Sequence, residues 1–146
     1  MSMKKRIGFA AVVMMIAVMC FGCPVFCDTP ESVMLARVNQ IRAEHGVAAL
    51  SEDPVLDAGA VVRAAETLSL LSHTRPDGTQ YYTVIPGENC YAENIGVAEN
   101  IDVTVNEWMN SQIHHDNMLN PAYTHVGVAK TADAAGNMRW ILLFTF

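Results

Sequence analysis

The chain has 146 residues, and its 15 acidic and 9 basic residues give it a formal net charge of −6. This length indicates one domain that can bury a core without the help of disulfide bonds. The charge argues against binding to nucleic acid, and it disfavours adsorption to an anionic membrane surface.

Residues 1–27 have the composition of an export signal. Three basic residues at positions 4–6 precede an uncharged apolar run over residues 7–21. That run is shorter than the roughly 20 residues that a membrane-spanning helix needs. We therefore predict a cleaved signal peptide over residues 1–27, a secreted domain over residues 28–146, and no transmembrane span in the mature chain.

Two alternatives concern how the exported chain is held. Cys23 follows a glycine and could carry a lipid that anchors the protein to the cell envelope, and an uncleaved N-terminal segment would also act as an anchor. Cleavage after Cys27 would leave Cys90 as the one cysteine of residues 28–146, so this domain would have no internal disulfide bond. We expect Cys90 to be a small, half-buried apolar residue rather than a reactive thiol or an intermolecular bridge.

Two helices are predicted next in the chain. Thr29 and Pro30 form a helix start, and apolar residues then recur at helical spacing until Gly46. Ser51 begins a second start signal, and we expect the helix that follows to end near Leu71. The expected buried positions of the two helices are Met34, Leu35, Val38 and Ile41, and Leu56, Ala60, Ala64 and Leu68.

The middle of the chain alternates between loops and short elements. We expect a turn over residues 75–78, a short extended piece over residues 81–85, and an irregular segment or short strand over residues 88–95. A third helix should span about residues 102–111, and a further helical turn should span residues 114–119.

The C-terminal part is predicted to be a β-hairpin. Its two strands span residues 123–129 and 138–146, and residues 133–137 connect them. The last strand is apolar at nearly every position, so we expect it to be central in the sheet and covered on both faces.

A polar stripe on the third helix is the first candidate for chemistry. Glu107, Ser111 and His114 would share it if the helix continued that far, because positions four and seven apart lie on one side of a helix. The stripe could face His73 and Glu93, and two imidazoles with one or two carboxylates suit zinc or a similar divalent ion. The same groups could instead hydrogen-bond the backbone of buried loops. A hydrolytic Ser-His-Glu triad is disfavoured, because three residues on one helix face cannot easily adopt its geometry.

Four motifs of this chain occur in the same order in a known family. They are HTRPDG at residues 73–78, ENIG at 93–96, WMNSQIHHDNMLNP at 108–121 and THVGVA at 124–129, and an aromatic strand follows them. With these motifs the chain resembles the CAP superfamily, the SCP-like extracellular domains of cysteine-rich secretory proteins, antigen 5 and pathogenesis-related type-one proteins. It is most similar to the compact secreted members from bacteria, and the resemblance covers about residues 32–146.

The resemblance implies an α+β fold, an α-β-α sandwich in which a small antiparallel sheet lies between helices. It also implies a central cavity with two histidines and two glutamates. His73, Glu93 and His114 match three of these, whereas Ser111 stands where animal and plant members have the second glutamate. Glu107, one turn earlier, is the candidate replacement. The residues expected to line the cavity beside these ligands are Ser111, Asn94 and Asn117.

The function that the resemblance implies is that of a secreted, non-enzymatic binding module. Its cavity would bind a divalent metal ion, zinc above all, and a small or lipidic ligand. Its partner would be an extracellular protein, a lipid or a small molecule. The alternative is a metal-dependent hydrolase or peptidase in which Glu93 or Glu107 activates a metal-bound water. A third interpretation is a surface-interaction protein with a purely structural cavity.

Overall fold

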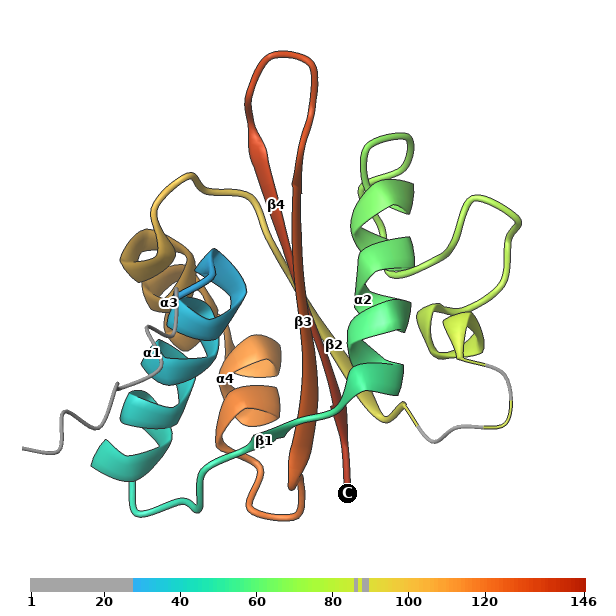
Figure 1. The fold of residues 1–146 in the computed structure, drawn as a ribbon. Helices are drawn as coiled ribbons and strands as arrows, with labels where there is room; N and C mark the ends of the chain where they lie inside the picture. Colours follow the sequence, from blue (N-terminus) through green and yellow to red (C-terminus); the bar gives the residue numbers. More distant parts are fainter. Residues whose placement is uncertain (1–27, 86, 88–89) are drawn as a thin grey trace, which may run out of the picture.

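A computed structural model describes residues 28–85, 87 and 90–146, so the signal peptide predicted for residues 1–27 lies outside the described residues (Figure 1). The elements in chain order are α1 (Pro30–Glu44), β1 (Ser51–Glu52), α2 (Pro54–Glu66), the 3-10 helix η1 (Tyr81–Val84), β2 (Ala92–Gly96), α3 (Ile101–Asn110), α4 (Gln112–Leu119), β3 (His125–Ala132) and β4 (Met138–Thr145). In the part of the chain that the structure describes, no helix is long and apolar enough to cross a membrane.

The elements form three layers. α1, α3 and α4 cover one face of the sheet, and α2 covers the other face (Figure 1). The predicted α+β class and the α-β-α sandwich are therefore confirmed. The sheet has the strand order β1-β3-β4-β2, in which β4 is antiparallel to both of its neighbours. The two-residue β1 pairs with β3 in parallel, so the sheet is mixed rather than purely antiparallel as predicted.

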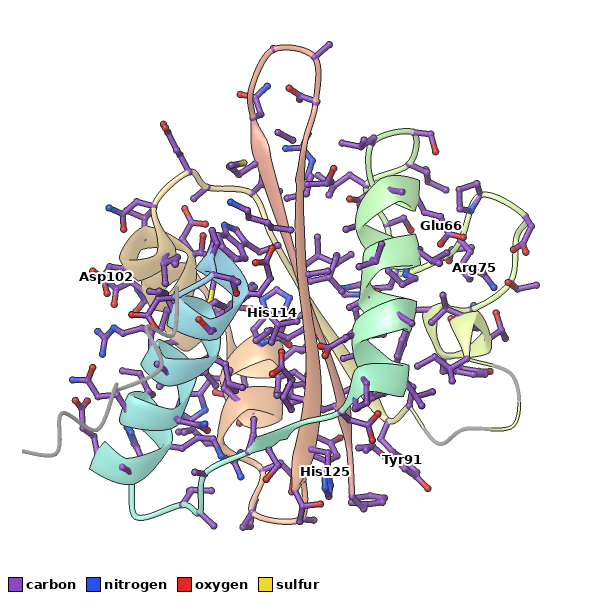
Figure 2. The ribbon with its side chains drawn as sticks, viewed as in Figure 1. Glu66, Arg75, Tyr91, Asp102, His114 and His125 are labelled. Carbon is purple, nitrogen blue, oxygen red and sulfur yellow. The ribbon has the colours of Figure 1, made fainter. Side chains whose placement is uncertain are left out.

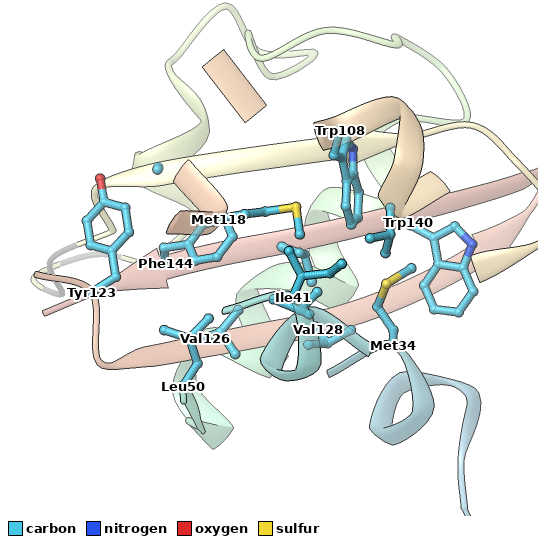
Figure 3. Close-up of a cluster of buried hydrophobic side chains, with 14 residues drawn as sticks. Met34, Ile41, Leu50, Trp108, Met118, Tyr123, Val126, Val128, Trp140 and Phe144 are labelled. Atoms are coloured by element: carbon cyan, nitrogen blue, oxygen red, sulfur yellow. The ribbon is translucent and has the colours of Figure 1, made fainter. Parts of the chain in front are cut away.

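β4 supplies side chains to both faces of the sheet. Trp140, Leu142 and Phe144 pack with α1, α3 and α4 in the first core, which Figure 3 shows. Ile141 and Leu143 point the other way and pack against α2 in the second core. This alternation follows from the two-residue period of a strand. The prediction of a central last strand covered on both faces is confirmed.

The starts of α1 and α2 follow from their capping residues. The side chain of Thr29 accepts a hydrogen bond from the backbone of Ser32, and Asp53 caps α2 in the same way. The second cap was assigned wrongly to Ser51, which instead belongs to β1 and donates its amide hydrogen to the carbonyl of Thr124 at 2.9 Å. A carboxylate at position 53, directly before proline, is the better cap because it accepts from two amides.

Two predicted boundaries in the middle of the chain were also wrong. α2 ends at Glu66 rather than near Leu71, and Leu68 is 44% exposed instead of buried. The hydroxyl groups of Thr67 and Ser69 bond to carbonyls of the last helical turn, which favours termination there. Residues 81–84 form a 3-10 turn and not an extended piece, with local bonds such as that from Thr83 to the carbonyl of Gln80.

Candidate functional site

His73 and His114 face each other across an open hollow. His73 lies in the loop after α2, and His114, which Figure 2 labels, lies in the first turn of α4 beside the strands. The centroids of the two imidazole rings are 6.3 Å apart, and their planes make an angle of 47°. Both histidines line a hollow of about 180 Å³, whose other walls are Leu71, Ser72, Ile95 and Val97. The two histidines that the sequence motifs singled out are therefore brought together.

The His73 ring is held by Glu93. Its Nδ1 atom lies 2.8 Å from Oε1 of Glu93, which is on β2 and 3% exposed. An ionised carboxylate can only accept a hydrogen bond, so Nδ1 carries the hydrogen in this contact. When the ring is neutral, its other nitrogen, Nε2, keeps a free lone pair. Half of the His73 side chain is exposed, so this lone pair is available in the hollow.

Arg63 is the third member of this cluster, and it was not predicted from the sequence. Its Nε atom donates to Oε2 of Glu93 at 2.7 Å, and its Nη2 atom donates to Oε1 at 3.2 Å. Both side chains are completely buried. Arg63 lies three residues after Ala60 and seven after Leu56, so helical periodicity places it on the inner face of α2. A buried arginine needs a partner, and this pattern could have predicted an ion pair.

The network continues outward from Arg63 to the loop that carries His73. Nη1 of Arg63 donates to Glu66 at 2.6 Å, and Arg75 donates to the same carboxylate at 2.8 Å. Figure 2 shows Glu66 and Arg75 side by side where the loop returns to α2. Although burial alone would raise it, hydrogen bonds from Arg75 and Arg63 lower the pKa of the Glu66 carboxyl group. The loop is therefore tied to α2 by charged hydrogen bonds.

Two asparagines hold the start of α4 against β2. The side-chain amide of Asn94, which is fully buried, donates to the backbone carbonyl of His114 at 3.1 Å. Asn117 donates in turn to the side-chain oxygen of Asn94 at 2.9 Å. These bonds position His114 through its backbone. Burial, and after it the charge of His73, lowers the pKa of His114, which favours its neutral form.

A second hollow, of about 210 Å³, also has His73 in its wall. Its walls are His73, Tyr81, Tyr91, Ala92, Glu93, Ile113 and Asn117. Burial raises the pKa of Tyr81 to about 12, so its hydroxyl stays protonated, and it donates to the carbonyl of Tyr91 at 3.1 Å. His73 thus lines both a hollow with largely aliphatic walls and one with aromatic and polar walls.

The structure does not bring Glu107 or Ser111 into the lining of either hollow. The predicted polar stripe required one continuous helix, but the chain breaks at Ser111, whose φ and ψ are −106° and 117°. α4 is therefore a separate helix and not a continuation of α3. Glu107 is exposed, and neither it nor Ser111 is among the residues that line the hollows. Three further residues, Ser111, Asn94 and Asn117, were expected to line the cavity beside the ligands. Of these, Asn117 lines a hollow, and Asn94 holds the backbone of His114 through a hydrogen bond.

The donor set for a metal ion is small. Among residues 28–85, 87 and 90–146, no three His, Cys, Asp or Glu side chains are grouped so that they could hold an ion together. Glu93 uses both oxygens for Arg63 and His73, which leaves the two imidazoles as the available protein ligands. Structural zinc sites usually have four protein ligands and catalytic sites three. A cation in this hollow would therefore have two histidine ligands, and solvent would have to complete its coordination.

Comparisons with known proteins agree with this architecture. Residues 35–146 match the sequence profile of the Cysteine-rich secretory protein family, CAP, and the chain belongs to this family. The resemblance inferred from the four motifs is thus confirmed. No curated protein sequence matched the chain in the corresponding comparison.

Three solved structures share the fold. An outer surface protein from Borrelia burgdorferi superposes with a TM-score of 0.71 and 21% identity, over 80% of this chain and 93% of that one. An extracellular protein containing an SCP domain from Bacillus anthracis superposes with a TM-score of 0.61 and 18% identity, over 79% of this chain and 40% of that one. A cysteine-rich secretory protein from Staphylococcus aureus superposes with a TM-score of 0.61 and 23% identity, over 79% of this chain and 38% of that one. The last two proteins are much longer than this chain, and identities this low show a common fold alone.

Proposed function

We propose that this protein is an extracellular CAP domain that binds a divalent cation, zinc above all, between His73 and His114. Two of the similar structures are described as an outer surface protein and an extracellular protein, which supports export of this chain. The basic and apolar start of the sequence supports it too, as a cleaved signal peptide over residues 1–27 or as an anchor through Cys23 or an uncleaved segment.

The observation that carries the proposal is the approach of the two imidazole rings to 6.3 Å in one hollow. A zinc ion sits about 2.0–2.1 Å from each ligating nitrogen. We expect the two rings to reorient on binding so that both Nε2 atoms reach that distance. The bond from Nδ1 of His73 to Glu93 is the arrangement that commonly orients a metal-ligating histidine. With two protein ligands, we expect weaker binding than at sites with three or four.

The two hollows beside His73 suit a small or lipidic ligand as a second occupant. Leu71, Ile95 and Val97 form the aliphatic walls of one hollow, and volumes of about 180 and 210 Å³ limit each to a small group. A ligand with an apolar part and a polar head group could place the head group at His73. This part of the proposal follows the chemistry of the walls.

A calorimetric zinc titration tests the proposal. The chain from Asp28 to Phe146 is compared with its His73→Ala and His114→Ala variants, and His125→Ala removes a half-buried histidine that lines neither hollow. We expect the unaltered chain and His125→Ala to bind zinc. In His73→Ala and in His114→Ala we expect the zinc affinity to be lower by about tenfold or more. Equal affinities in all four proteins would contradict the proposal.

The alternative of a metal-dependent hydrolase finds no support in the geometry. Such an enzyme needs a general base that is free to take a proton from water. Glu93 accepts hydrogen bonds from Arg63 and His73, and Glu107 is exposed and does not line the hollows. We therefore propose binding rather than catalysis. Chelator-sensitive turnover of a peptide library, abolished by Glu93→Gln, would reverse this choice.

A further inference from the structure

We infer that Arg63 is a positioning residue for the cleft, by which we mean the hollow between His73 and His114. Arg63 fixes His73 through two separate contacts and keeps Glu93 from binding a ligand. This inference rests on the proposed function, because it states how the binding histidine is prepared. Arg63 lines neither hollow, and its hydrogen bonds go to Glu93, Glu66 and the Ser72 carbonyl. Its action on the cleft is therefore indirect.

The first contact acts on the ring of His73. Arg63 donates to both oxygens of Glu93, at 2.7 and 3.2 Å, and Oε1 of the same carboxylate accepts from Nδ1 of His73 at 2.8 Å. The fork of the guanidinium fixes the plane of the carboxylate. That plane in turn sets the direction of the bond to Nδ1. Nε2 of His73 is left as the nitrogen that meets a ligand.

The second contact acts on the backbone of His73. Nη2 of Arg63 donates to the carbonyl oxygen of Ser72 at 2.7 Å, and Ser72 directly precedes His73. Arg63 thus holds the peptide that carries the imidazole as well as the acceptor that orients it. Glu66 and Arg75 hold Arg63 and the loop from the outer side.

A role for Glu93 follows from the same contacts. A carboxylate that ligates a metal or accepts a proton must turn an oxygen toward the cleft. Both oxygens of Glu93 are hydrogen-bonded, and its side chain is completely buried beside a buried positive charge. Turning the carboxylate toward the cleft would break its bonds to Arg63 and leave that buried charge with Glu66 as its remaining carboxylate partner. Glu93 is therefore an orienting group, and the predicted ligand set of the cleft reduces to its two histidines.

Lysine cannot replace arginine in this position. A lysine ammonium is a single charged centre, whereas Arg63 spreads its donors over Glu93, Glu66 and the Ser72 carbonyl. Arg63→Lys keeps the positive charge but loses the fork. Glu93→Gln keeps the shape of the acceptor but adds an amide donor, so that Nδ1 of His73 can accept instead of donate.

The experiment reads the tautomer of His73 by nitrogen-15 NMR of the chain from Asp28 to Phe146, metal-free at about pH 8, where an ordinary histidine is neutral. This chain contains every residue of both cores, which extend from Met34 to Phe144. We expect Nδ1 of His73 to carry the hydrogen in the unaltered chain. In Arg63→Lys and in Glu93→Gln we expect the hydrogen to move substantially to Nε2, and the zinc affinity to fall about 10- to 100-fold.

Arg42→Lys is the matched control. Arg42 is also completely buried, but it lies on α1 and donates to the carbonyls of Ala48, Met118, Asn120 and Tyr123, on the opposite side of the sheet. We expect this variant to lose stability while the tautomer of His73 stays unchanged. Arg63 would have no special role if Arg42→Lys altered His73 as much as Arg63→Lys did.

The outcomes separate this inference from the proposed function. The tautomer is measured without metal, so an unaltered chain that binds no zinc would remove the proposed function and leave the test of Arg63 intact. The inference is overturned if His73 of the unaltered chain carries its hydrogen on Nε2. It is also overturned if Arg63→Lys keeps both the tautomer and the zinc affinity. Should Arg63→Lys fail to fold, Glu93→Gln decides by the same two measurements.

Discussion

Gly127 of β3 lies directly against the backbone of Leu56 in α2, so a Cβ atom at position 127 would overlap the carbonyl group of Leu56. Neither backbone can move alone, because β3 is bonded to β4 and α2 is packed over both strands. We expect Gly127→Ala to lower the free energy of unfolding by about 3 kcal/mol. Urea denaturation measures this change.

Gly59→Ala is the comparison for that prediction. A methyl group there would meet the side chain of Ile85 at 2.6 Å rather than a backbone. Because a side chain can shift, we expect a smaller loss, about 1 kcal/mol. Equal losses in the two variants would show that the approach of α2 to β3 is not the cause.

The buried pair of Arg63 and Glu93 gives a second prediction about stability. Glu93→Leu would leave the guanidinium partly uncompensated in the core, and we expect a loss of about 3 kcal/mol or more in unfolding free energy. Asp102→Ala breaks the pair with Arg37, in which the aspartate is 67% exposed, and should cost about 1 kcal/mol or less. The prediction fails if both variants unfold at the same urea concentration.

The sequence predicted elements whose causes are local. Thr29 and Pro30 correctly indicated the start of α1. The glycines at positions 46, 78 and 136 correctly marked turns, where their φ values of 72°, 86° and 86° lie in the region that favours glycine. The continuous apolar run of β4 indicated its central place. Residues 81–85 were predicted as a short extended piece, but residues 81–84 form a 3-10 helix, in which Thr83 bonds to the carbonyl of Gln80 and Tyr81 bonds to the carbonyl of His73.

The candidate site was harder to predict, because its geometry depends on one backbone break. Helical periodicity predicted that Glu107, Ser111 and His114 share one face of a single helix. A periodic pattern does not show that Ser111 adopts an extended conformation and ends that helix. Helical spacing suggested that His114 could face His73, and the family motifs then matched both histidines to the expected cavity. Arg63 was missed because its partner, Glu93, is 30 residues away in the sequence.

Stability should depend on pH through His114. Burial and the charge of His73 lower its pKa from 6.5, so the unfolded chain binds this proton more readily than the folded one. The contribution of neutral His114 to the free energy of unfolding is therefore fully present above about pH 6.5. It is lost as the pH falls from 6.5 through the lowered pKa of His114 in the folded chain. We expect the stability difference between the metal-free unaltered chain and His114→Gln to shrink on acidification. Urea denaturation at several pH values measures it, and a pH-independent difference would contradict the assignment.

Cys90 should be inert in the folded protein. It is free, 7% exposed and packed in the second core, and burial raises the pKa of its thiol to about 12. Thiolate is therefore scarce at neutral pH, and we expect Ellman's reagent to react with the chain from Asp28 onward at least about tenfold more slowly than after denaturation. Ala43→Cys places a second thiol at an exposed position and should react at once. Rapid labelling of Cys90 in the native state would contradict its burial.

The position of β4 in the chain has a consequence for biosynthesis. This strand joins β3 to β2 and fills both cores, yet the ribosome makes it after all the other elements. The nascent chain therefore lacks the central strand of its sheet until residues 138–145 emerge, and neither core can be completed before then.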